Sequence, residues 1–365
     1  MNRRDFLKGI AGGIGLVIAG SIIEFKPYDK KEIYGINLTR RLCNEKIANQ
    51  EMIEILDKMH INDVALHLLW FQDGVGGCEF KDNIDNKLAT PNDSNVKELI
   101  NILKSRNKYI IIKPTVYVLQ DVQWYNNQFN LCFHNKEDNI NSLFLRDSKW
   151  RGKIKPSDIN LWFENYEELI KHYVKLTKNL GIDAVCIGTE LSSMQVYTEN
   201  WQHLIKNIRK EFNGRITYCA NWDAYNDIEF FSDLDYISIS AYFPLVKKDE
   251  DPSLEKLINS WMIIGEDLKK LSKRFNKEVV FGEIGYRSAS GSATQHNANL
   301  TIVDYEEQRL CFEALDYVLR NRIIPVSKAY LWVGDTHGLG YNNKVGRVGF
   351  EIFGKPAEKE ILSKS

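Results

Sequence analysis

The stretch Val279-Val280-Phe281-Gly282-Glu283-Ile284-Gly285-Tyr286-Arg287 is an apolar run that ends in one carboxylate between two glycines. Such a run, bounded by glycine, is typical of a parallel strand that is covered on both faces. A second stretch, Ala184-Val185-Cys186-Ile187-Gly188-Thr189-Glu190, repeats the order of apolar run, glycine and glutamate. Two buried strands that present glutamate at the same end predict a pair of carboxylates that face a shared cavity.

The composition of the chain limits its class and its partners. Its 365 residues suffice for one large domain or two ordinary ones, and a hydrophobic content of 44% supports a sizeable core. With 48 basic and 49 acidic residues, the chain is almost neutral, so we expect neither nucleic acid nor an anionic membrane held by bulk charge. Aromatic residues make up 12% of the chain, a content that suits stacking on sugar rings. A neutral substrate is therefore favoured.

The six cysteines give no sign of a metal site or a disulfide framework. They form no CxxC pair and show no zinc-like spacing. Cys186 and Cys219 fall in predicted core strands, where a small buried thiol is the usual role. We therefore expect no metal and no cofactor.

The N-terminal segment has the features of an export signal. Asn2-Arg3-Arg4-Asp5-Phe6-Leu7-Lys8 precedes a glycine-rich apolar run from Ile10 to Ile23. It resembles a twin-arginine signal, with Asn2 where Ser or Thr is usual, so the export machinery is an expected partner. A short membrane anchor is the alternative, because no clear cleavage site is visible. We exclude residues 1–28 from the fold and expect a periplasmic, extracellular or membrane-anchored protein outside the cytoplasm.

The remainder of the chain alternates short apolar runs with segments of helical periodicity. Strands are predicted at Ile33–Leu38, Asp63–Leu69, Tyr109–Val116, Ala184–Thr189, Ile216–Asn221, Tyr236–Ala241, Val279–Ile284 and Ala329–Gly334. Helices are predicted at Glu45–His60, Ser94–Asn107, Leu161–Leu180, Glu199–Phe212, shortly after Ala224, at Leu254–Phe275, at Tyr305–Arg322 and from Pro356 onward. Eight strand-then-helix units in strict order predict an α/β fold, a single (β/α)8 TIM barrel over residues 29–365, which we expect to be a monomer.

One connection is unusually long. The segment from Tyr117 to Asn160 joins the third strand to its helix, and loops of that length are commonly functional. At the catalytic face of a barrel, it would form a cleft wall or a lid. Within it, Trp150-Arg151-Gly152 is a candidate to reach the substrate.

The strand ends supply the candidate catalytic residues, because barrel enzymes assemble their sites there. The fourth predicted strand ends in Glu190, and the seventh ends in Glu283. Glycoside hydrolysis needs two carboxyl groups across the scissile bond, about 5 Å apart in retaining enzymes. A salt bridge or a helix cap is the ordinary role of one such glutamate, but the matched pair favours catalysis.

Other strand ends carry side chains suited to sugars, namely flat rings for stacking and polar groups for hydroxyls. The candidates are Trp70, Lys113, Asn221, Trp222, Tyr242 and Trp332, together with Arg151 from the long connection. Tyr242 could donate a hydrogen bond to the nucleophilic carboxylate, and Arg287 could either neutralise Glu283 or cap the next helix. His67 and His337 are too few for a metal cluster and are interpreted as ordinary polar residues.

At these residues the sequence resembles clan A of the glycoside hydrolases, and family 113, known as endo-β-mannanases, in particular. The resemblance spans nearly the whole mature chain, and its most specific parts are Gly188-Thr189-Glu190-Leu191 and Gly282-Glu283-Ile284-Gly285-Tyr286-Arg287-Ser288. It implies that Glu190 is the acid/base and Glu283 the nucleophile. It also implies that Tyr242 and Trp332 lie beside the subsite where the bond breaks. The clan usually has Asn before the acid/base, where this chain has Thr189, and we suggest Asn221 for the lost contact with the sugar 2-hydroxyl.

The sequence therefore predicts a retaining glycoside hydrolase that cleaves a β-linked polysaccharide, β-1,4-mannan first, by double displacement. Another clan A specificity, such as a glucanase or galactanase, is the main alternative, because fold and carboxylates do not set the sugar. A non-catalytic carbohydrate-binding barrel and a metal-dependent barrel hydrolase are the alternatives from other classes.

Overall fold

The computed structural model describes residues 33–38, 53–54, 56–57, 59–84, 88–89, 92–119, 150–295, 298–334 and 348–362. The predicted export signal lies outside these residues, as do Cys43, Cys132 and His337. Most of the helix predicted at 45–60 and residues 120–149 of the long connection also lie outside them.

Eight parallel strands of the described chain close into a barrel. They are β1 (Tyr34–Leu38), β2 (Asp63–Asp73), β6 (Tyr109–Leu119), β7 (Ala184–Thr189), β8 (Arg215–Asn221), β9 (Ile237–Ser240), β10 (Val279–Ile284) and β13 (Val326–Gly334). Each pairs with the next along the chain, and β1 closes the ring by pairing with both β2 and β13. The predicted (β/α)8 TIM barrel is confirmed, with β7 and β10 as its fourth and seventh strands.

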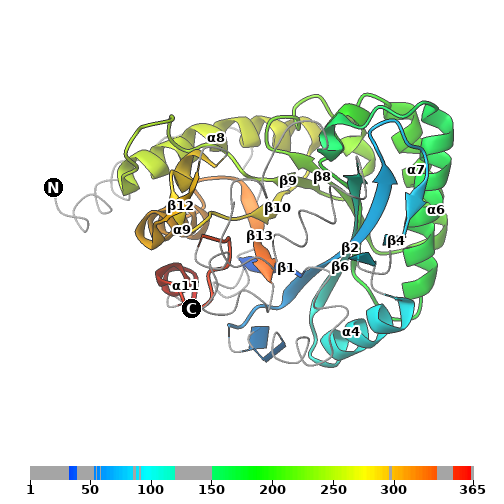
Figure 1. The fold of residues 1–365 in the computed structure, drawn as a ribbon, viewed down its shortest axis with the longest axis horizontal. Coiled ribbons are helices and arrows are strands. Elements are labelled where there is room, and N and C mark those ends of the chain that lie inside the picture. The colour runs from blue at the N-terminus through cyan, green and yellow to red at the C-terminus, as the bar shows by residue number, and fades with distance from the viewer. Residues whose placement is uncertain are drawn as a thin grey trace.

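Helices cover the outside of the barrel, as Figure 1 shows. Their bounds are α4 (Asp93–Ser105), α6 (Ile159–Thr177), α7 (Thr198–Glu211), α8 (Leu254–Phe275), α9 (Tyr305–Arg320) and α11 (Pro356–Leu362). Four begin where a polar side chain accepts a backbone N–H of the first turn, the capping residues being Asn92, Asp158, Ser253 and Asp304. No helix in the described ranges is both long and apolar enough to cross a membrane.

Several short elements surround the barrel, and all of them except the turn η4 were absent from the sequence prediction. These are β3 (Phe80–Lys81), β4 (Asn83–Ile84), β5 (Leu88–Ala89), β11 (Ala289–Ser290), β12 (Asn299–Val303), and the 3-10 turns η2 (Arg151–Lys153), η3 (Ser192–Met194), η4 (Glu229–Asp233) and η5 (Ser292–Thr294). The turn η4 occupies the place of the short helix predicted after Ala224. Most of these elements have only two or three residues, too few to show a periodicity that could be recognised in a sequence.

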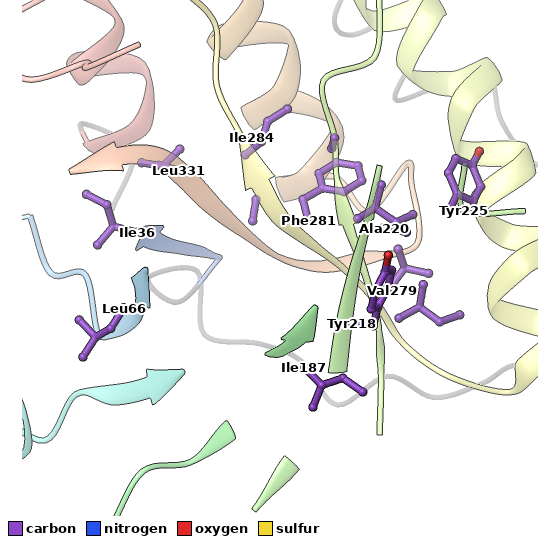
Figure 2. Close-up of a cluster of buried hydrophobic side chains, with 14 of the residues drawn as sticks. Ile36, Leu66, Ile187, Tyr218, Ala220, Tyr225, Val279, Phe281, Ile284 and Leu331 are labelled. Atoms are coloured by element: carbon purple, nitrogen blue, oxygen red, sulfur yellow. The ribbon is translucent and has the colours of Figure 1, made fainter. Parts of the chain in front are cut away.

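Strand alternation divides the buried side chains into two cores. Val279 and Phe281 of β10 point outward and pack with side chains of the helices and neighbouring strands. Figure 2 shows this outer core, with Ile36, Leu66 and Leu331 contributed by other strands. Val280, between them in sequence, points inward and packs with barrel-lining side chains that include Ala65, Cys186 and Tyr330. Inward positions nearer the strand exits are polar, and they form the candidate site.

Candidate active site

Glu283 reaches the barrel interior because β10 is irregular beside it. Simple alternation after the inward Val280 would send Glu283 outward with Phe281. The register of β10 against β9 shifts between Phe281 and Glu283, and such a bulge re-aims the side chains that follow it. Glycine is required here, because a Cβ on Gly282 would lie 2.2 Å from Oγ of Ser238. The Gly-Glu pair in the sequence therefore reflects the geometry that turns the carboxylate inward.

Both oxygens of the Glu283 carboxylate have donors. Lys113 of β6 approaches Oε1 with its Nζ at 2.6 Å, and the hydroxyl of Tyr242, just after β9, donates to Oε2 at 3.1 Å. Burial by itself lowers the pKa of Lys113, but nearby groups that become negative, Cys219 and Glu283 foremost, raise it overall. Lys113 is therefore a cation, and it favours an ionised Glu283.

His67 of β2 lies beside this pair. Its Nε2 is 3.7 Å from Oε1 of Glu283 and donates to Oδ1 of Asn37 at 2.9 Å, while its Nδ1 lies 3.2 Å from the Thr115 hydroxyl. Burial, followed by the charges of Lys113 and Arg151, holds the pKa of His67 well below its ordinary value. The imidazole is therefore neutral, and its hydrogen bonds fix its position. The Trp332 ring packs edge-on against it, with 4.9 Å between the ring centres.

Glu190 follows β7 with an unusual backbone conformation. Its φ is 52°, in the left-handed region that side chains other than glycine rarely adopt. The conformation is held by its N–H, which donates to the Cys219 carbonyl at 2.8 Å, and by the Leu191 N–H, which donates to the Tyr218 hydroxyl at 3.0 Å. Strained residues of this kind concentrate at functional sites.

The carboxylate of Glu190 pairs with Arg151. Nη2 of Arg151 lies 2.9 Å from Oε2 of Glu190, and the guanidinium carbon lies 5.8 Å from the centre of the Tyr117 ring. Arg151 comes from η2, in the long connection that the sequence analysis identified. Although burial lowers the pKa of Arg151, the charge of Glu190 contributes first to a net rise, so Arg151 is a permanent cation here.

The two glutamates share one electrostatic environment around Tyr242. The pKa of the Tyr242 hydroxyl is raised well above its ordinary value, first by burial and then by the charges of Glu283 and Glu190. The charges of both glutamates also act on Arg151. The carboxylates from the fourth and seventh strands therefore act on the same two side chains, Tyr242 and Arg151.

The other predicted residues are distributed unequally around this space. Asn221, at the end of β8, is buried and donates to Oδ1 of Asp223 at 2.6 Å. The rings of Trp222 and Phe243 pack together with 5.9 Å between their centres. Trp222 also lines an open cleft of about 540 Å³. The remaining lining residues of this cleft include Pro244, Lys247, Lys248, Ser260 and Thr294. The Arg287 guanidinium lies over the Phe350 ring, 4.2 Å from its centre.

The structure does not bring Trp70 to the carboxylates. Its indole nitrogen donates to the hydroxyl of Tyr173 on α6 at 2.8 Å, on the outer side of the barrel. The strand β2 runs to Asp73 without a break in register, so alternation from the inward Ala65 places His67 inside and Trp70 outside. The prediction used only the position of Trp70 near the strand end and neglected this parity.

Two residues beside Glu283 were not predicted as site residues: the sequence analysis interpreted His67 as an ordinary polar residue and did not name Asn37. Both lie at inward positions near the ends of predicted strands, so parity counted from neighbouring small core residues would have identified them. Asn37 is further fixed by donating to the Gly282 carbonyl at 3.1 Å, which connects β1 to the bulge beside Glu283.

Comparison with known proteins agrees with the barrel fold. The sequence model of Glycoside Hydrolase Family 113 matches residues 33–323. A solved β-1,4-mannanase of that family is 22% identical, with 91% of this chain and 98% of the other covered and a TM-score of 0.69. A family 113 β-mannanase from Alicyclobacillus acidocaldarius is 20% identical, with 91% and 96% covered and a TM-score of 0.69. An endo-1,4-β-D-mannanase from Thermotoga petrophila is 14% identical, with 91% and 99% covered and a TM-score of 0.52. No curated protein matches the chain.

Proposed function

Because the chain belongs to glycoside hydrolase family 113, we propose that it cleaves β-1,4-linked mannan with retention of configuration at the anomeric carbon. The observation that carries the proposal is the pair of buried glutamates, Glu190 and Glu283, grouped around Tyr242 at the exits of the fourth and seventh strands. The choice of mannan rests on the family 113 β-mannanases of known structure.

In the first step, an oxygen of Glu283 attacks the anomeric carbon and forms an ester bond to the sugar. The bond from that carbon to the leaving sugar breaks, and the departing oxygen takes the proton of Glu190. Lys113 and Tyr242 each hold one oxygen of Glu283, which fixes the orientation of the carboxylate before substrate arrives.

In the second step, Glu190 takes a proton from a water molecule, whose oxygen bonds to the anomeric carbon. The ester bond to Glu283 breaks and regenerates the free carboxylate. Two displacements on opposite faces of the sugar give net retention. Glu190 therefore has to be protonated at the start of one step and ionised at the start of the next.

We assign the sugar contacts to side chains around the two carboxylates. Trp332, packed on His67, is a stacking surface next to Glu283, and Trp222 is a second one in the open cleft. Asn221 lies on the strand next to that of Glu190 and is the candidate for the 2-hydroxyl contact. An Asn221→Ala variant with wild-type kinetics would remove this assignment.

The test is a reducing-sugar assay of the purified protein on β-mannan, β-glucan and β-galactan. We expect release from mannan, a complete loss in Glu283→Ala, and a loss of about 10²–10⁴-fold in Glu190→Gln. Glu168→Gln, an exposed glutamate on α6, is the matched control and should keep full activity. Proton NMR of the first product formed should show the β-anomer. Normal hydrolysis by Glu283→Ala would overturn the assignment.

The same assay separates the alternatives. Release of reducing sugar from glucan or galactan alone would change the assigned substrate but would leave the double-displacement mechanism in place. Binding to polysaccharide without release of sugar would favour a non-catalytic barrel, and loss of activity on treatment with a chelator would favour a metal-dependent hydrolase.

We further propose that the protein is exported by the twin-arginine route and acts as a monomer. The export proposal is supported by Arg3-Arg4 and the apolar run that follows them. Replacement of both arginines by lysine should leave the protein in the cytoplasm, as fractionation would detect. Light scattering of the purified chain tests the monomer.

A further inference from the structure

The pairing of Arg151 with Glu190 conflicts with the first step of the proposed reaction. The two side chains are 15% and 8% exposed, and their ion pair is therefore largely shielded from solvent. A cation this close favours the ionised carboxylate, whereas a general acid must carry a proton when the glycosidic bond breaks. The pair assists the second step, in which Glu190 acts as a base.

Two hydrogen bonds hold the backbone just after Arg151, so the contact is built into the fold. The Ser193 hydroxyl donates to the Ile154 carbonyl at 2.5 Å and ties η3 to the segment that carries Arg151. The N–H of Lys155, the next residue, donates to the Val75 carbonyl at 2.8 Å. Arg151 in η2 and Glu190, two residues before η3, are therefore carried by two turns that are joined directly.

Within the described ranges, the charged and titratable groups that face this pair are few. The carboxylates of Glu190 and Glu283 and the hydroxyl of Tyr117 act on Arg151. Arg151 in turn acts on the neutral His67 and on the buried hydroxyl of Tyr166. Glu190 also acts on the Tyr242 hydroxyl, which is protonated. Among the described residues, Arg151 is therefore the cation in direct contact with Glu190, while Lys113 pairs with Glu283.

One N–H donor of Arg151 has no acceptor among the described residues. Its Nε is buried and has no hydrogen-bond partner in the described part of the chain, and the hydroxyl of Ser192, two residues after Glu190, is in the same condition. A buried donor without a partner is unfavourable, so an acceptor that completes the set is favoured. A hydroxyl oxygen of the bound sugar is such an acceptor.

We propose that Arg151 is a positioning residue that biases Glu190 towards its role as base in the second step. This inference rests on the proposed function, because it assigns Glu190 two successive tasks. Arg151 holds the carboxylate ionised and oriented for water activation, at the expense of the proton that the first step requires.

The test compares Arg151→Met and Arg151→Lys with the wild type in the pH dependence of kcat/KM on a manno-oligosaccharide. Loss of the cation lets Glu190 keep its proton to higher pH. The alkaline limb should therefore move to higher pH in Arg151→Met and stay near wild type in Arg151→Lys. Arg209→Met, which breaks a surface pair with Asp235, is the matched control and should leave the profile unchanged.

A second readout isolates the second step. A dinitrophenyl mannoside releases its aglycone without a proton, so Glu190 is needed only as base. With this substrate, kcat of Arg151→Met should fall by about tenfold or more, and azide, which attacks without a base, should restore it. An unshifted alkaline limb, or a fall that azide does not restore, would overturn the proposal.

The two proposals fail in different ways. A wild-type protein that is inactive on mannan but active on another β-glycan would overturn the mannan proposal, and the Arg151 variants would then be measured on aryl glycosides of that sugar. A wild-type protein inactive on every glycan would overturn both. Thermal unfolding of each variant checks that it is folded.

Discussion

Nζ of Lys113 lies 2.6 Å from Oε1 of Glu283, with both side chains only 3% exposed. Lys113 belongs to the third barrel strand and Glu283 to the seventh, so the pair crosses the interior of the barrel. Sequence analysis assigned Lys113 to the substrate. In the structure, Lys113 forms an ion pair with the carboxylate that we propose as nucleophile. The charge of that carboxylate is therefore balanced by Lys113.

Lys113→Met should strongly impair both stability and activity. Removal of one partner from a buried ion pair leaves an uncompensated charge, at a cost of about 3–5 kcal/mol in the free energy of unfolding. The variant can avoid this cost by protonating Glu283, and a protonated carboxyl group is a poor nucleophile. Urea unfolding and kcat/KM on mannan measure the two effects. The exposed Lys269→Met, which breaks a surface pair with Glu266, should change the stability by no more than about 1 kcal/mol. Equal results for the two variants would contradict the role of Lys113.

Tyr242→Phe should reduce kcat while the fold is kept. The variant loses the hydrogen bond to Oε2 of Glu283. A hydrogen bond to a charged group contributes about 1.5–3 kcal/mol, which corresponds to a loss of roughly 10–100-fold. Tyr225→Phe, on the outer core, is the matched control and should leave kcat unchanged. If both variants were fully active, the hydroxyl of Tyr242 would have no part in the reaction.

The barrel and the positions of Glu190 and Glu283 at the ends of its strands could be predicted from the sequence, because both depend on local pattern. The strands Ala184–Thr189 and Val279–Ile284 are long apolar runs, and the structure gives them the predicted bounds. Contacts across the barrel, such as Lys113 with Glu283, depend on side-chain direction and on bulges, which one sequence does not reveal. The ion pair of Arg151 depends on where η2 lies relative to the end of β7, and local pattern contains no information on that.

The error at Trp70 has a related cause. A position near the end of a strand does not say which face of the barrel the side chain occupies, and a shift of one residue reverses the face. On the regular β2 strand, the alternation of inward and outward side chains alone would have favoured His67 over Trp70 as a site residue. On β10 the bulge breaks parity, so the same rule would have misplaced Glu283.

Gly282→Ala tests whether the bulge beside Glu283 needs glycine. The added Cβ would lie 2.2 Å from Oγ of Ser238 and 2.7 Å from Sγ of Cys219, so these two side chains, the strands or the bulge must shift. We expect a loss of about 1–3 kcal/mol in stability and a larger proportional loss in kcat, because Glu283 is displaced. Gly76→Ala is the matched control, since its Cβ would approach nothing closer than 3.9 Å, at the Lys155 carbonyl oxygen. Wild-type kcat in Gly282→Ala would show that the bulge tolerates a side chain.

Lys355 gives the stability of the protein a specific dependence on pH. Its side chain is only 4% exposed, and its Nζ contacts the Ser288 hydroxyl at 2.9 Å and the Gly349 carbonyl at 3.4 Å. Burial lowers the pKa of Lys355 from 10.5 to about 8, against the opposing effect of Glu351. In the unfolded chain, the pKa of the Lys355 amine keeps its ordinary value of 10.5.

Between about pH 8 and pH 10.5, the unfolded state therefore binds more protons at Lys355 than the folded state does. The contribution of this residue to the free energy of unfolding should rise with pH through that window and be least favourable below it. A shift of this size corresponds to roughly 3 kcal/mol. Lys355→Met should remove the rise. The free energy of unfolding of the variant minus that of the wild type should therefore fall from pH 7 to pH 10.5. Urea unfolding at several pH values measures it, with the exposed Lys269→Met as control. A difference that stays constant with pH would show that Lys355 titrates alike in the folded and unfolded chains.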